Sequence, residues 1–71
     1  MAAVKVYYDR EGQTLTVWFG DPANEYEAEE TGDEIILMKD IHGRVIGFEK
    51  LNFAPDPNSN PLHVAFETIA I

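Results

Sequence analysis

The sequence has no cysteine, a single serine, two histidines and only five basic residues. Without cysteine, disulfide bonds and thiolate metal sites are excluded. His42 and His63 lie too far apart in the chain to suggest a structural zinc site. Ser59 lies in a proline-rich stretch with no base nearby in the sequence. We therefore expect no cofactor and no metal, and the sequence leans against an enzyme without deciding the question.

Basic residues are scarce beside thirteen acidic ones, which leaves a formal charge of −8. This balance opposes binding to nucleic acid phosphates and docking on anionic membranes. It permits a basic protein partner. No apolar run is long enough to cross a membrane, and the N-terminus lacks the apolar core of a signal peptide. We expect a cytoplasmic protein that binds neither nucleic acid nor membrane.

A chain of 71 residues makes one domain, and so short a chain buries only about 60% of its unfolded surface. Small domains usually add disulfides, a metal or association with another chain. Since the first two are excluded or unsupported, association remains. We expect a single β-rich domain over residues 1–71, in which residues 54–61 form a proline-rich loop before the C-terminal segment.

Four runs rich in β-branched and aromatic residues predict an antiparallel sheet of two hairpins. They cover residues 4–8, 14–19, 34–39 and 45–51. Gly12 and Gly43 lie in the two turns, and we expect Gly43 at a positive φ. Asp9 should accept hydrogen bonds from backbone amides of the first turn. Residues 25–30 alternate acidic residues with Tyr or Ala, which favours a short edge strand over a helical turn.

The C-terminal segment from Leu62 to Ile71 is ambiguous. Its alternation favours a strand, whereas its i, i+3, i+4, i+7 spacing also fits a helix. The fold class we expect is therefore mainly β, a small antiparallel sheet of two hairpins with a C-terminal strand. The alternative is an α+β fold with a C-terminal helix.

Both faces of the second hairpin are apolar, which is unusual for an antiparallel sheet with one face in water. Trp18 extends this second face to the first hairpin, and Leu15, Val17 and Phe19 belong on the opposite face, in a core. We expect another copy of the chain to cover the second face, most simply in a twofold dimer. The interface residues predicted are Trp18, Ile36, Met38, Val45, Leu51 and Phe66.

Single residues carry weaker signals of chemistry. Gly47 inside a strand predicts a bulge or the close approach of a side chain such as Trp18. Glu49 is the acid that a catalytic site would use, although a cross-strand pair with a lysine such as Lys39 is the simpler interpretation. His42 is interpreted as a polar loop residue, and the acidic run from Glu25 to Glu34 as a solvated surface rather than a calcium site.

The segments Lys5–Asp9, Leu15–Val17, Ile35–Leu37 and Gly43–Asn52 resemble a family of short, mainly bacterial proteins classed as a domain of unknown function. Its members carry a YD-x-x-x-D-x-L-x-(V/I) opening and a G-x-(V/I)-(V/I)-G-(I/F)-E-x-L-N closing segment. The resemblance spans residues 4–53, and the chain departs from it at Gly12-Gln13-Thr14, where the family often has a second Asp. It implies a compact β-rich fold and no established activity. Some members are encoded beside small toxin-like proteins, which implies a possible antitoxin role.

Three functions therefore remain open. The chain is a small acidic interaction protein that acts as a homo-oligomer or with a protein partner, or an antitoxin that neutralises a small basic toxin. The third hypothesis is a ligand-binding or enzymatic module with a site at a subunit interface, for which Tyr7, Trp18 and Glu49 would line a pocket.

Overall fold

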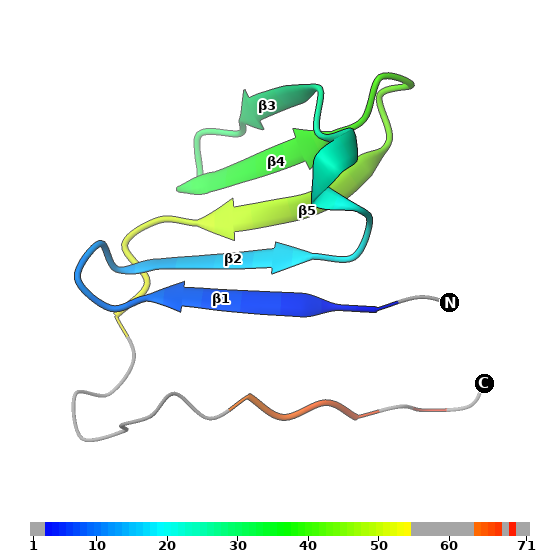
Figure 1. Cartoon of the computed structure of the whole chain (residues 1–71). Coiled ribbons are helices and arrows are strands. Elements are labelled where there is room, and N and C mark those ends of the chain that lie inside the picture. Colours follow the sequence, from blue (N-terminus) through cyan, green and yellow to red (C-terminus); the bar gives the residue numbers. More distant parts are fainter. Residues whose placement is uncertain (1–2, 55–63, 68, 70–71) are drawn as a thin grey trace.

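The structure is a computed structural model and describes residues 3–54, 64–67 and 69. Five strands run in chain order, together with one short 3-10 turn. Figure 1 labels the strands as β1 (Lys5–Asp9), β2 (Thr14–Trp18), β3 (Glu27–Glu30), β4 (Ile35–Lys39) and β5 (Val45–Lys50). The 3-10 turn η1 covers Pro22–Asn24.

All neighbouring strands are antiparallel, in the order β1-β2-β5-β4-β3. Short turns join β3 to β4 and β4 to β5. After β2 the chain crosses to the far edge of the sheet to form β3, and it returns through β4 to β5, which pairs with β2. Four strands therefore form a Greek key, with β2 beside β5. Figure 1 shows β1 and β3 as the two edges, with β5 in the middle.

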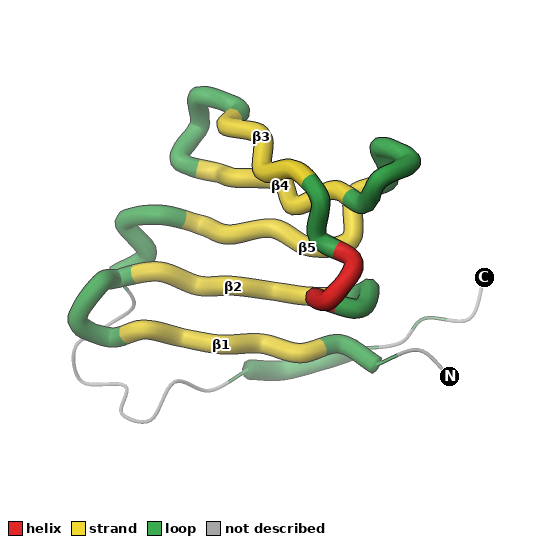
Figure 2. The backbone as a smooth tube through the Cα atoms, turned by 45° about the horizontal axis from the view of Figure 1, so that its top comes forward, coloured by secondary structure: helices red, strands yellow, loops and turns green. Residues whose placement is uncertain are grey.

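The connection from β2 to β3 crosses one end of the sheet, where η1 lies in front of β5 (Figures 1 and 2). The backbone N–H groups of Phe19 and Gly20 both donate to the carbonyl oxygen of Ile46, at 3.0 and 2.9 Å. The carboxylate of Asp21 accepts from the N–H of Ala23 at 2.9 Å and so begins η1. The N–H of Tyr26 then donates to Lys39 at 2.8 Å, which attaches the connection to the end of β4.

Directly paired residues of antiparallel strands lie on the same side of a sheet, so the register assigns each residue to a face. We call one side the apolar face; its large side chains are Val6, Tyr8, Leu15, Val17, Ile35, Leu37 and Phe48. We call the other side the tryptophan face; it carries Tyr7, Thr16, Trp18, Ile36, Met38, Gly47 and Glu49. Sequence alternation alone had grouped Leu15 with Val17, and Ile36 with Met38, in the same way.

Burial is slight on both faces. Met38, at 4% exposure, is the one buried hydrophobic side chain among the described residues, and all seven large side chains of the apolar face are only half-buried. Figure 2 shows the strands as one twisted layer. Domains normally bury an apolar sheet face against a second layer. In the described part of the chain, no second layer of helix or strand covers the apolar face.

The mainly β fold is confirmed, and each of the four predicted strands forms within one or two residues of its expected bounds. The acidic edge strand also forms, as β3, and supplies the fifth strand of the sheet. The C-terminal strand is not observed over Val64–Glu67 and Ile69, which are neither strand nor helix. In Figure 1 these residues are drawn apart from the sheet, beyond β1. The proline-rich loop lies outside the described residues beyond Ala54.

Within the described ranges, no helix is long and apolar enough to cross a membrane.

Candidate functional site

The six predicted interface residues do not share one surface. Trp18, Ile36 and Met38 lie on the tryptophan face, as expected. Val45 pairs with Lys39, because the register shifts between Met38 and Lys39. This bulge carries Val45 to the side of the apolar face.

The other two predicted interface residues lie away from this group. Leu51 follows β5 and is half-buried. Phe66, in the C-terminal segment, is 70% exposed. The structure therefore brings together three of the six residues.

On the tryptophan face, the ring of Trp18 lies close to Gly47. They are cross-strand partners, and a Cβ at position 47 would lie 2.8 Å from Cε3 of Trp18 and 2.7 Å from the carbonyl oxygen of Val17. The indole ring occupies the space that any side chain at position 47 would need. Of the two alternatives predicted for Gly47, the close approach by Trp18 is confirmed. Gly47 itself pairs regularly with Met38, and the register shifts only beyond this pair, between Met38 and Lys39.

The loop between β4 and β5 is organised by Asp40, which is only 8% exposed. Its Oδ1 accepts from the N–H groups of His42 and Arg44, at 2.9 and 3.0 Å, and its Oδ2 accepts from Nε of Arg44 at 2.9 Å. The hydrogen bond from the Arg44 backbone is the main reason that the pKa of Asp40 is lowered. Both oxygens are engaged within the loop, so Asp40 serves structure rather than acid–base chemistry.

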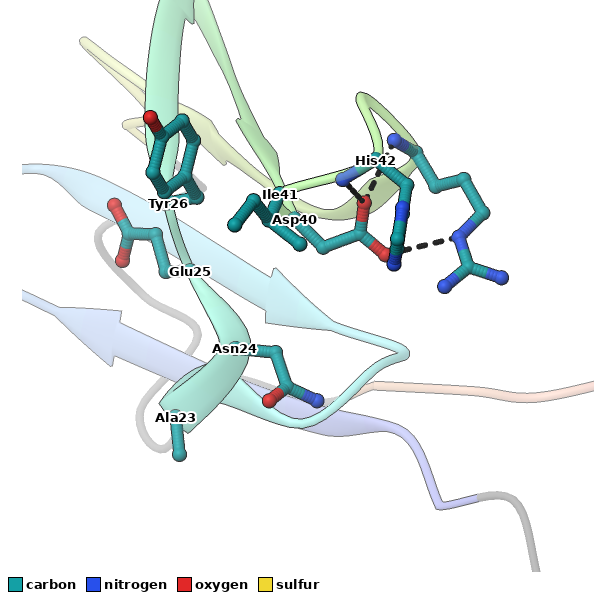
Figure 3. Close-up of a pocket in the computed structure, with 8 residues that line it drawn as sticks. Ala23, Asn24, Glu25, Tyr26, Asp40, Ile41 and His42 are labelled. Carbon is teal, nitrogen blue, oxygen red and sulfur yellow. Dashed lines mark hydrogen bonds and ion pairs between the residues drawn. The ribbon is translucent and has the colours of Figure 1, made fainter.

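An open pocket of about 390 Å³ lies between this loop and the connection that carries η1. Figure 3 shows Ala23, Asn24, Glu25 and Tyr26 on the connection, apart from Asp40, Ile41 and His42 on the loop. Arg44 also lines the pocket. Asp40 is one of the lining residues, but its two oxygens accept hydrogen bonds within the loop and are not free to act as acid or base in this pocket.

A second network ties the opposite end of the sheet together around Glu34. Its two carboxylate oxygens accept from Nζ of Lys50 and from Nδ2 of Asn52, each at 3.0 Å. The hydrogen bond from Lys50, followed by that from Asn52, lowers the pKa of Glu34. Glu34 and Asn52 both have a positive φ, of 61° and 53°. Such φ values are strained for a glutamate, and the two side-chain bonds hold it in place.

Acidic residues concentrate on the β3 edge. We call the set Glu25, Glu27, Glu29, Glu30, Asp33 and Glu34 the acidic edge. Every residue of β3 is exposed, and so is Tyr26, at 68%. Nζ of Lys39 lies 2.7 Å from Glu29, and this hydrogen bond raises the pKa of Lys39. Alternation had indicated the strand but not the lysine partner.

The predicted pair of Glu49 with Lys39 is wrong. Lys39 bonds to Glu29 instead, and the register places Glu49 between Thr16 and Ile36 on the tryptophan face. Tyr7 and Trp18 share that face, but neither they nor Glu49 line the pocket beside the Asp40 loop. They also do not line a smaller pocket of about 210 Å³ beside Glu34 and Leu51. Asp9 accepts from the N–H of Gly12 at 3.1 Å, as predicted.

His63 and Ser59 lie outside the described residues. Within residues 3–54, 64–67 and 69, no group of three or more histidines and acids is placed to hold a metal ion.

Searches of curated proteins and of solved structures give no match to this chain. The family described as "Protein of unknown function (DUF2283)" matches residues 5–53. This range covers all five strands and the Asp40 and Glu34 networks, and it agrees with the segments that carried the resemblance. The chain is a member of the DUF2283 family.

Proposed function

We propose that this protein is an interaction module that binds a basic protein along the acidic edge. The observation that carries this proposal is the charge distribution around β3. Six acids and no base occur between Glu25 and Glu34. Lysines bridge two of them, Glu29 and Glu34, and the remaining four form no salt bridge within the described residues.

The backbone of β3 supports the same partner. As the edge strand, β3 pairs with β4 on one side only, so its other side presents N–H and C=O groups to a further strand. Glutamates along such an edge repel a second copy of β3 and favour a basic segment, since like charges across strands are destabilising. Exposed Tyr26 adds an aromatic side chain of the kind that often anchors interfaces.

The binding should depend strongly on salt. A concentrated negative edge speeds the encounter with a basic protein, and ions screen this attraction when the charges are exposed. The test is purification of the tagged full-length chain from its native cells in low salt, with the bound protein identified and its affinity measured. We expect a basic partner whose affinity falls at least tenfold at about 0.5 M salt.

Two variants make this experiment specific. Glu27→Gln with Glu30→Gln removes two charges from the acidic edge, whereas Glu11→Gln with Glu67→Gln removes two charges elsewhere. Both change the net charge by the same amount. We expect only the first to weaken binding. A partner that binds both variants equally, or one that is itself acidic, contradicts the proposal.

The antitoxin hypothesis is the special case in which the basic partner is a toxin, and the acidic edge suits it. Co-expression with a basic protein encoded beside its gene is the test. If the basic protein alone stops the growth of the host cells, co-expression of the wild-type chain should restore growth, and co-expression of the Glu27→Gln, Glu30→Gln variant should not. A cytoplasmic location is part of this proposal.

A further inference from the structure

The second edge of the sheet, β1, carries opposite charges at its two ends. It pairs with β2 on one side only, so the backbone N–H and C=O groups of its other side can accept a further strand. Lys5 begins the strand and Asp9 ends it; both are exposed, and neither forms a salt bridge within the described residues. Asp9 uses its Oδ1 for the Gly12 amide, which leaves Oδ2 for a lysine.

The sequence of β1 is complementary to itself when two copies run antiparallel. Pairing all five residues places Tyr7 opposite Tyr7, Lys5 opposite Asp9 and Val6 opposite Tyr8. By symmetry, each of the last two pairs occurs twice. Opposite charges and aromatic side chains paired across strands are stabilising, whereas like charges directly opposite are destabilising. A parallel pairing would bring like charges together, so the charges of β1 select the antiparallel arrangement.

We infer that a second copy of this chain pairs with β1, so that two five-stranded sheets join edge to edge into one continuous sheet. A twofold axis normal to the sheet, between the two Tyr7 residues, relates the copies. This axis keeps each face of one copy on the same side as the same face of the other. Lys5, Tyr7 and Asp9 then meet their partners on the tryptophan face, and Val6 and Tyr8 meet theirs on the apolar face.

The formal charge of −8 does not oppose this pairing, because the acidic edge lies at the other end of the strand order (Figure 1). Four strand spacings in each copy and one between the copies separate the two acidic edges, which at about 4.8 Å each is about 43 Å along the sheet. Charges on a protein surface are screened over about 8 Å at physiological ionic strength. Pairing through β3 would instead bring glutamates together. A second copy therefore fits β1 and not β3.

The paired edge is short, which sets how tightly the copies hold. Five residues on each side bury less than the roughly 800 Å² that each partner contributes to a stable interface of standard size. We therefore expect a weak dimer that forms as the concentration rises from the micromolar to the millimolar range. Residues 64–67 and 69 of the same chain, which Figure 1 draws apart from β1, form no strand and are the competing occupant of this edge.

Amide hydrogen exchange of the wild-type chain separates these two occupants. The amides of β1 that point away from β2 should exchange more slowly as protein concentration rises, while the outward amides of β3 should not change. Light scattering should give a mass that rises from 8.0 kDa toward twice that value. Protection of β1 that is independent of concentration would assign the edge to the C-terminal segment and overturn the inference. A mass of 8.0 kDa throughout the range would also overturn it.

Charge variants test the pairing of Lys5 with Asp9. Lys5→Glu places an acid opposite Asp9 of the second copy, twice in each dimer, so it should raise the dissociation constant about tenfold or more. The control is Arg10→Glu, which makes the same change of charge in the turn after β1 and should leave the dissociation constant nearly unchanged. Equal effects of the two variants would mean that net charge, and not strand pairing, controls association, which contradicts the inference.

A mixture of two variants tests the register directly. Asp9→Lys alone should also associate poorly, because lysine would face lysine. When Lys5→Glu is mixed with Asp9→Lys, every charged pair is again unlike, so the two should bind each other more tightly than either binds itself. Folded variants that do not associate when mixed contradict the register. If Asp9→Lys fails to fold without its Gly12 bond, the exchange and Lys5→Glu measurements still decide. All of these experiments use the chain alone, so their outcome is independent of binding at the acidic edge.

Discussion

The indole ring of Trp18 occupies the position where a side chain at residue 47 would have to lie. A Cβ there would come within 2.8 Å of the ring and 2.7 Å of the carbonyl oxygen of Val17. Only glycine allows β2 and β5 to pair at this point with Trp18 on the sheet surface. The opposite neighbour of Gly47 on β4 is Met38, the most buried hydrophobic residue described.

Gly47→Ala should destabilise the protein by about 1–3 kcal/mol, because the methyl group must displace the ring or the strand. The chain has one tryptophan, so its fluorescence reports on this contact directly. We expect the emission of the variant to shift to the red at temperatures where its sheet is still formed.

The matched control for that substitution is Glu49→Ala, two residues further along the same strand and on the same face. It also replaces a β5 residue by alanine but brings no atom toward Trp18. If both variants have the same tryptophan emission and stability, the ring does not need the space at position 47.

Local patterns predicted much of this fold. Runs of β-branched and aromatic residues marked four of the strands, alternation marked the acidic edge strand, and the glycine turns separated them. Gly43 has φ of 78° and Asp9 receives the Gly12 amide, as their residue types suggested. These features depend on a few residues adjacent in the chain, which is why the sequence reveals them.

The features that were missed depend on residues far apart in the chain. The bulge near Met38 moves Val45 to the other face, and a shift of one residue reverses every assignment beyond it. The partner of Lys39 is decided by pairing with β3, which the chain reaches only through the connection after β2. Asp40 is the exception, because its partners His42 and Arg44 are only two and four residues away; an aspartate at the start of a turn was a local signal that the sequence analysis did not use.

Gly43 supplies a clean test of backbone strain, since nothing lies within 4 Å of the position a Cβ would take. Gly43→Val should cost about 1–2 kcal/mol, because a β-branched residue resists positive φ. Gly43→Asn should cost less, since asparagine adopts this conformation more readily. Thermal melts would show the order Gly, Asn, Val, and equal melting temperatures would contradict it.

Asp40→Ala should lower the melting temperature by roughly 5–10 °C, because two loop amides lose their acceptor. Asp40→Asn keeps one oxygen and should lie between the alanine variant and wild type. Arg44→Ala removes only the side-chain bond of an exposed arginine, so it should be almost neutral. An Arg44→Ala effect as large as that of Asp40→Ala would mean that the ion pair, not the amide bonds, holds the loop.

Glu34 predicts how stability changes in acid. The pKa of Glu34 is lowered in the folded protein from its usual 4.5, so the folded state binds the proton less readily than the unfolded state. Its contribution is therefore fully present above about pH 4.5 and is lost as the pH falls through the folded-state value. Glu34→Gln should flatten the decline in melting temperature between about pH 6 and pH 3.

Lys50→Met separates this effect from the other carboxylates, because Lys50 is the largest cause of the shift. It should flatten the acid decline in the same way, and the double variant with Glu34→Gln should add nothing further, since the two residues act as one unit. All of these variants should still lose melting temperature in acid through Asp40, whose pKa is also lowered, because the hydrogen bonds of Asp40 do not involve Lys50. If Lys50→Met has the acid profile of wild type, the lysine does not hold the carboxylate of Glu34 in solution.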